Sequence, residues 1–282
     1  MRRLFTLKIK KNLSKTLLAG PYLVWMIAFT IIPLCMVGVY GLTDRTGVFT
    51  MDNLTLLAQR GYMKALLLSL GLSLLSTVIC LALSYPLAMI LRSRGNGRKG
   101  FMVFLFILPM WMNFLLRTLA WRTLLEKNGV INALLDLMGL PSLQIINTPA
   151  AIVLGMVYNF LPFMILPVYN CLMKIDNDVI NAAKDLGANA FQTFFRVILP
   201  LSVPGIISGV TMVFIPALTT FVISDLLGGG KVLLIGNIIE QKFTTANNWH
   251  VGSGLSLVLM IFILISMAVL NKYDKNGEGN AF

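Results

Sequence analysis

The chain has 282 residues, of which 57% are hydrophobic and 12% are charged, and its formal net charge is +12 at pH 7. This composition, with its long uncharged runs, excludes a water-soluble globular protein and indicates an integral membrane protein. The surplus of lysine and arginine does not indicate nucleic-acid binding, because the basic residues are scattered over short segments that flank the apolar runs. We therefore expect a lipid bilayer around the chain and no nucleic-acid partner.

Six apolar segments are long enough to cross a bilayer as helices, since a span needs about 20 residues at a rise of roughly 1.5 Å each. They are residues 19–42, 65–91, 101–121, 149–171, 201–224 and 251–270. Transmembrane β-strands are not expected, because these runs do not alternate polar with apolar residues. The third segment is the weakest, since Arg117 interrupts it and must lie near a headgroup layer or snorkel towards one. The sequence thus predicts an all-α membrane protein with one transmembrane domain over residues 1–282.

The distribution of basic residues predicts the orientation of the spans. Lysine and arginine are enriched in cytoplasmic segments of membrane proteins. Six of them precede the first span, and four lie in the link at residues 92–99. Three more lie in the link at residues 174–200 and two in the C-terminal tail, so fifteen of the 23 basic residues lie on the side of the two termini. We therefore predict that both termini are cytoplasmic.

The residue types that carry most enzyme chemistry are scarce in this chain. Three cysteines, Cys35, Cys80 and Cys171, lie inside apolar segments, where a thiol behaves as a small hydrophobe. The single histidine, His250, is expected in an external loop. We therefore expect no disulfide framework, no metal site and no catalytic residues, and hence no enzyme.

A nucleotide site is also not expected. The one glycine-rich stretch that ends in lysine is GGGKV, residues 228–232. Asp225 stands where a P-loop needs its first glycine, and Val232 stands where it needs serine or threonine. The charge distribution also assigns this stretch to the external side. We therefore expect a tightly turned or flexible loop here, and no cofactor bound by this chain.

The link between the fourth and fifth spans, residues 174–200, is polar and helix-forming. Residues 176–178 supply candidate N-caps for a first helix, and Gly187 suits the left-handed conformation that often ends helices. Asn189 with Gln192 resembles a capping box for a second helix. The pattern predicts a cytoplasmic helix, turn and helix that leads directly into the fifth span.

The same link carries a resemblance to the permease subunits of ABC importers. Their signature loop reads Glu-Ala-Ala, three residues, Gly, nine residues, then Ile-x-Leu-Pro, and this chain has Asn181-Ala182-Ala183, Gly187 and residues 197–200 (VILP) at that spacing. The resemblance implies a coupling helix that docks on a separate ATPase. It assigns that role to Asn181, Ala182, Ala183, Asp185, Leu186 and Gly187. Asn181 replaces the usual glutamate, so a contact made there through a carboxylate would need a neighbouring acid such as Asp185.

Three further segments, beginning at Leu108, Thr148 and Ile223, look like the first permease of spermidine/putrescine importers. This resemblance implies the six-helix type I ABC importer permease fold in the plasma (inner) membrane. It also implies a second permease, two copies of a cytoplasmic ABC ATPase that uses ATP and Mg²⁺, and an external polyamine-binding protein. The alternatives are a permease for ferric iron, a phosphonate or an opine, and then a secondary transporter or channel.

A polyamine route should offer carboxylates and aromatic faces to ammonium groups. Asp225, at the end of the fifth span, is the first candidate, and Glu240 in the following loop is the second. The rival interpretation pairs Asp225 with Arg117, Arg122 or Lys231. The aromatic candidates are Trp111, Trp121, Tyr158 and Phe160, although aromatic residues at span ends commonly form interface belts.

One pair of small residues predicts close helix packing. Gly205 and Gly209 form a small-xxx-small pattern in the fifth segment. Such a pair lets a neighbouring helix approach closely.

Overall fold

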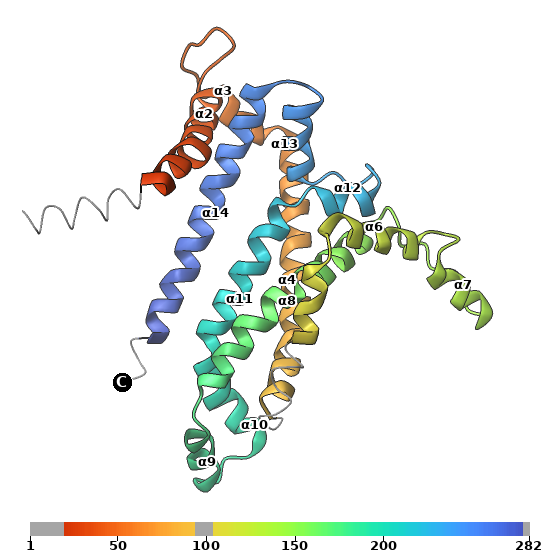
Figure 1. Ribbon diagram of the computed structural model, residues 1–282, viewed down its shortest axis with the longest axis vertical. Helices are drawn as coiled ribbons and strands as arrows, with labels where there is room; N and C mark the ends of the chain where they lie inside the picture. The colour runs from red at the N-terminus through yellow and green to blue at the C-terminus, as the bar shows by residue number, and fades with distance from the viewer. Residues whose placement is uncertain (1–19, 94–103, 279–282) are drawn as a thin grey trace, which may run out of the picture. The chain divides into compact units, whose positions relative to one another are not determined.

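The computed structural model describes residues 20–93 and 104–278, and in these residues the regular elements are helices (Figure 1). An isolated β-bridge pairs Thr43 with Phe49. The all-α prediction is confirmed for the described residues. The basic segment before the first span, and residues 94–103 of the basic link and third segment, lie outside them.

Five helices in the described residues are long and apolar enough to cross a membrane. They are Gly20–Gly41, Arg60–Ser93, Pro149–Lys174, Ala190–Thr219 and Trp249–Leu270. These helices overlap the first, second, fourth, fifth and sixth predicted segments. The third predicted segment is not one straight helix, because Phe104–Trp111 and Phe114–Leu137 meet at an angle of 95°. The pair makes a sixth span only if the bend itself lies within the membrane.

The chain divides into two compact units, and the first comprises the residues up to 58 together with 242–260. It contains η1 (Ile27–Ile31), α2 (Ile32–Gly41), α3 (Asp52–Thr55), η2 (Leu56–Ala58) and the start of α14 (Trp249–Glu278). His250 was expected in a loop but lies in the first turn of α14, where its Nδ1 is 2.7 Å from the Thr43 carbonyl oxygen. Asn53 donates to the same carbonyl at 3.0 Å.

The second unit comprises residues 59–241 and the residues from 261 onward. Its core is formed by α4 (Arg60–Ser93), α8 (Pro149–Lys174) and α11 (Leu199–Thr219), which pack side by side (Figure 1). The central helix is α8, whose Ile152, Met156, Met164, Val168 and Leu172 side chains are fully buried. Close packing of these side chains is what holds the three helices together within the unit.

The predicted close packing at Gly205 and Gly209 is confirmed. A Cβ atom at Gly205 would lie 2.4 Å from Cys171 Cβ and 2.8 Å from the Pro167 carbonyl oxygen. One at Gly209 would lie 2.6 Å from Met164 Sδ. The two glycines therefore let α11 sit directly on α8.

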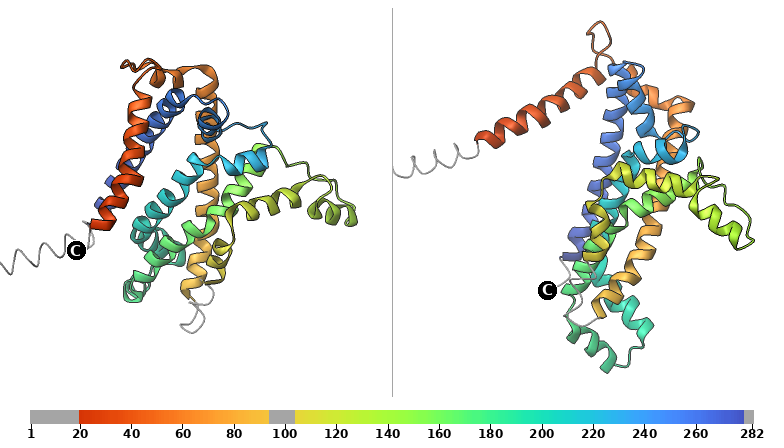
Figure 2. Two further views of the ribbon diagram at one scale, coloured as in Figure 1. Left: turned by 45° about the horizontal axis from the view of Figure 1, so that its top comes forward. Right: turned by 45° about the vertical axis from the view of Figure 1, so that its right-hand side comes forward.

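The bend in the third segment has a local cause. The η3 helix (Leu108–Trp111) ends at Met112, and Asn113 caps α6 (Phe114–Leu125) by accepting from the Leu115 and Leu116 backbone N–H groups. Arg117 is 6% exposed, and its Nη1 donates to the Pro109 carbonyl at 2.7 Å across the bend. After α6 the chain forms α7 (Val130–Leu137), which projects from the core of this unit (Figure 2).

The two ends of the three-helix core carry different structures. At one end lie α9 (Asn177–Asp185), α10 (Ala190–Thr193) and η4 (Phe194–Ile198), and η4 runs into α11. At the other end lie α12 (Val222–Gly228) and α13 (Ile235–Thr244). The fifth predicted span was too long, because α11 ends at Thr219 and residues 222–224 already belong to α12.

Candidate functional site

The hairpin between α8 and α11 has the capped structure that its sequence predicts. The Asp176 side chain accepts from the Asp178 backbone N–H at 3.0 Å and so caps the start of α9. Gly187 has a φ of +82°. Its N–H donates to the Lys184 carbonyl, and the Ala188 N–H reaches back to Ala183, which is the Schellman pattern of a helix end.

The second helix of the hairpin begins with the predicted capping box. The Gln192 N–H donates to Asn189 Oδ1 at 2.8 Å, and the Asn189 N–H donates to Gln192 Oε1 at 3.0 Å. Both bonds satisfy backbone donors that a helix start leaves unpaired. Because both helix ends are held by local bonds, the turn between α9 and α10 has a defined shape.

The predicted coupling residues lie together on the outer surface of this hairpin. Asn181, Ala182, Asp185, Leu186 and Gly187 are exposed, and Ala183 is half-buried. Leu186 is 89% exposed, which is unusual for so apolar a side chain at the tip of a helix. A cavity of about 440 Å³ lies beside it, lined by Ala183, Leu186, Gly187, Ala188, Gln192, Arg196 and Val197. This surface is suited to receive an apolar or mixed segment of another protein.

Asp225 lies at the opposite end of the core, in the first turn of α12. Its side chain is exposed, while Ile223 and Leu227 on the same helix are fully buried. In the described residues Asp225 forms no ion pair with Arg117, Arg122 or Lys231, and Arg122 pairs instead with Glu126 at 3.6 Å. The side chain therefore lies at the surface of this unit.

The position of α12 depends on Asn237, a residue that the sequence analysis missed. Asn237 is 3% exposed, and its Nδ2 donates to the Phe221 carbonyl at 3.0 Å, at the break between α11 and α12. Its Oδ1 accepts from the Ser224 hydroxyl and the Leu234 N–H. A lone asparagine inside the apolar run LLIGNII was the only sequence signal for this role.

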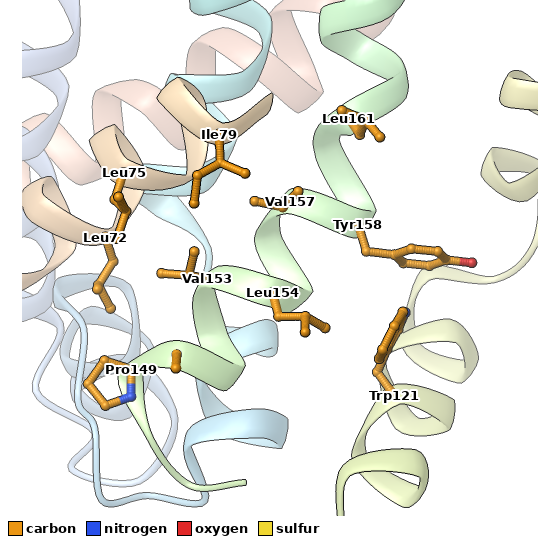
Figure 3. Close-up of a pocket in the computed structure, with 11 residues that line it drawn as sticks. Leu72, Leu75, Ile79, Trp121, Pro149, Val153, Leu154, Val157, Tyr158 and Leu161 are labelled. Carbon is orange, nitrogen blue, oxygen red and sulfur yellow. The ribbon is translucent and has the colours of Figure 1, made fainter. Parts of the chain in front are cut away.

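Tyr158 and Trp121 meet beside an apolar groove between α4, α6 and α8. Their ring centroids are 5.1 Å apart, and the Arg117 guanidinium carbon lies 5.7 Å from the Tyr158 ring centroid. The groove has a volume of about 620 Å³, and Leu72, Leu75 and Ile79 of α4 face Val153 and Val157 of α8 across it (Figure 3). Asp225 and Glu240 are not among its lining residues.

The remaining predicted pathway residues do not join this groove. Trp111 is 77% exposed and packs edge-on against Phe104. Phe160 is buried in the core against Phe163. Glu240 was expected in a loop but lies within α13. The structure thus brings the six predicted coupling residues together, whereas the candidate cargo residues remain spread over η3, α6, α8, α12 and α13.

A family match defines the class of protein. Residues 84–273 match the family described as binding-protein-dependent transport system inner membrane component, and this match covers α8 to α13 and most of α14. The chain belongs to this family, and it is a multi-pass inner-membrane transport protein.

The chain is also similar to particular proteins, one by sequence and two by fold. The chain is 38% identical to the spermidine/putrescine transport system permease protein PotB of Haemophilus influenzae, over 95% of this chain and 97% of that protein. The fold is similar to that of a bacterial ABC transporter involved in the import of the acidic polysaccharide alginate, with a TM-score of 0.81 at 18% identity over 97% of this chain and 99% of that one. A second structure, of a bacterial alginate ABC transporter in complex with a periplasmic protein that holds an alginate pentasaccharide, gives a TM-score of 0.79 at 16% identity over 95% and 96% of the two chains.

Proposed function

We propose that this chain forms half of the translocation pathway of an ATP-driven importer for polyamines such as spermidine and putrescine. The observation that carries the cargo class is the 38% identity to a spermidine/putrescine permease over nearly the whole of both chains. The likeness to the alginate transporters supports the importer fold but not the cargo, because identity there is only 18%.

The importer requires partners that this chain does not supply. We propose a second permease, two copies of a cytoplasmic ABC ATPase, and an external polyamine-binding protein. ATP and Mg²⁺ are then used by the ATPase, and this chain couples to it without a nucleotide site of its own. The periplasmic protein in the alginate transporter complex supports a binding-protein partner by analogy.

The hairpin of α9 and α10 is the proposed docking surface for the ATPase, on the cytoplasmic side with both termini. Leu186 and Ala182 are exposed there without an apolar covering, and Gly187 fixes the turn beside them. Asn181 cannot supply a carboxylate, but Asp185 lies one turn later, and residues four apart share a face of a helix. Asp185 therefore supplies any carboxylate contact that this docking surface makes with the ATPase.

Asp225 is the proposed cargo-contacting acid at the external end of the core. Its side chain is exposed and has no ion-pair partner among Arg117, Arg122 and Lys231 in the described residues. A carboxylate of this kind attracts the ammonium groups of a polyamine through charge-assisted hydrogen bonds. Trp111, Tyr158 and Glu240 are secondary candidates, because an aromatic face or a second acid adds to such a contact.

The proposal is tested by ATP hydrolysis in the purified complex of this chain with the products of its neighbouring genes. The binding protein is added with spermidine, putrescine, ferric iron, a phosphonate or an opine. We expect only the polyamines to stimulate hydrolysis. Stimulation by another solute would contradict the proposed cargo while supporting the importer role, and hydrolysis that responds to no solute would contradict both.

A further inference from the structure

The two arms of the α9–α10 hairpin are joined to the membrane core in different ways. On the returning arm, α10, η4 and α11 form one continuous helix, Ala190–Thr219. On the outgoing arm, Ile175 and Asp176 are both extended, with ψ angles of 121° and 139°, between the end of α8 and the start of α9. The backbone therefore connects α10 rigidly to α11, whereas α9 is joined to α8 only through a hinge.

Arg92 of α4 spans this hinge. Its Nη2 donates to the Ile175 carbonyl at 2.9 Å and to Asn177 Oδ1 at 3.0 Å. One guanidinium nitrogen thus holds the first residue of the hinge and the first residue of α9. Charge-assisted bonds of this kind are stronger than neutral ones.

The same face of α4 also holds the returning arm. Tyr85 lies seven residues before Arg92, which places the two side chains on one face of the helix two turns apart. The Tyr85 hydroxyl is 2.7 Å from the Ser202 hydroxyl, and its ring packs edge-on against Phe194 at 5.6 Å between centroids. Tyr85 is 8% exposed and Ser202 is fully buried, so this contact belongs to the packed core.

We propose that α4 acts as a clamp on the coupling hairpin, with Arg92 as the positioning residue that converts the hinge between α8 and α9 into a fixed joint. This inference rests on the proposed role of the hairpin in coupling to an ATPase. A force applied to α9 then moves α4, α8 and α11 as one body. Without Arg92 the same force is absorbed by rotation at Ile175 and Asp176, and ATP is hydrolysed with less movement of the pathway.

The clamp is tested directly by spin labels in the assembled complex, without any cargo. One label is placed at Ile90, which is 50% exposed and lies on the side of α4 away from Arg92, and the other at Lys184, an exposed residue of α9. The native cysteines are replaced by alanine. We expect a narrow distribution of distances between the two labels when Arg92 is present and a broad distribution in Arg92→Gln. The distribution should be narrow again in Arg92→Lys, because lysine keeps a charged donor.

A matched control removes a positive charge at the same end without breaking the clamp. Lys174 is exposed in the last turn of α8, and Lys174→Gln should leave the distribution narrow. A distribution that stays equally narrow in Arg92→Gln would overturn the clamp. Broadening of the same size in Lys174→Gln would also overturn it, because the effect would then come from charge and not from the contact.

The functional readout is the amount of polyamine transported per ATP hydrolysed. We expect Arg92→Gln to lower this ratio about threefold while basal hydrolysis and subunit assembly stay unchanged, because the bond to Asn177 is exposed and the bond to Ile175 only partly buried. An unchanged ratio would contradict the role of the clamp in coupling. If the wild-type complex transports no polyamine, the proposed cargo fails, and the distance measurement still decides the clamp.

Discussion

Gly187 is the residue on which the shape of the α9–α10 hairpin, the proposed coupling element, depends most. Its φ of +82° closes the Schellman turn between α9 and α10, and a Cβ atom at this position would meet no atom within 4 Å. The constraint is therefore one of backbone conformation and not of space. Residues other than glycine adopt the left-handed conformation at a cost of about 1–2 kcal/mol, and this cost is lowest for asparagine.

Gly187→Val should therefore change the direction of α9 and uncouple ATP hydrolysis from transport. We expect the transport rate to fall about tenfold, since roughly 1.4 kcal/mol corresponds to a factor of ten. Gly187→Asn is the matched control, because asparagine tolerates the left-handed conformation, and it should keep most of the activity. Uptake and coupled hydrolysis at wild-type levels in Gly187→Val would contradict the docking role of the hairpin.

Unlike Gly187, whose role rests on its backbone conformation, Asp225 is proposed to act through its charge and its exposure. Asp225→Asn keeps the shape of the side chain and removes its charge. We expect spermidine-stimulated transport to fall about threefold or more, while assembly of the complex is unchanged. Asp225→Glu should restore part of the loss. Unchanged uptake in Asp225→Asn would remove this residue from the cargo route.

At the scale of whole elements, the packing of α11 on α8 is the most demanding contact of the second unit. Gly205 meets the Pro167 carbonyl and Cys171 with no room for a methyl group. Membrane helices gain little from the hydrophobic effect against lipid, so their association depends on such close contacts. The contact therefore sets how closely α11 lies on α8.

Gly205→Val should push α11 away from α8 and destabilise the protein by about 1–3 kcal/mol, the usual range for overpacking. Thermal unfolding of the purified complex in detergent measures the effect as a lower Tm. Gly71→Ala serves as the control, because Gly71 lies in α4 with nothing within 4 Å of an added Cβ, and its Tm should stay the same or rise slightly. A Tm unchanged in Gly205→Val would show that the close approach is not needed.

Helix ends were predictable where the signal is local. Asp176, Gly187 and the Asn189–Gln192 pair act on backbone groups within four residues, so their sequence was sufficient to predict α9 and α10. The bend before α6 was not predictable in this way. Asn113 supplies a local cap at the start of α6, but the Arg117 contact with the Pro109 carbonyl crosses the bend, and a charge within an apolar run does not reveal where its partner lies.

The coupling residues were easier to predict than the cargo residues, because local signals can be read from a sequence and contacts between distant residues cannot. The coupling residues follow one another on a single hairpin, so a sequence motif brings them together. The cargo candidates come from separate helices, and the position of each depends on tertiary contacts such as those of Asn237 at the start of α12. Arg92 was interpreted only as a topology signal, because its partners lie more than 80 residues away.

At the scale of the whole molecule, the chain belongs to a family of inner-membrane transport components and has a fold similar to that of ABC importer subunits. Its coupling hairpin and its candidate cargo acid lie at opposite ends of one three-helix core. Such an arrangement suits a subunit that receives force at one end and opens a pathway at the other. A secondary transporter or channel would move its solute without a separate ATPase.

Uptake of radiolabelled spermidine into proteoliposomes tests this central claim most directly. Vesicles that hold the full complex should take up spermidine only when the binding protein is present on one face and ATP with Mg²⁺ on the other. Vesicles that hold this chain alone should take up none. Uptake by the chain alone, or uptake by the complex without ATP, would contradict the account.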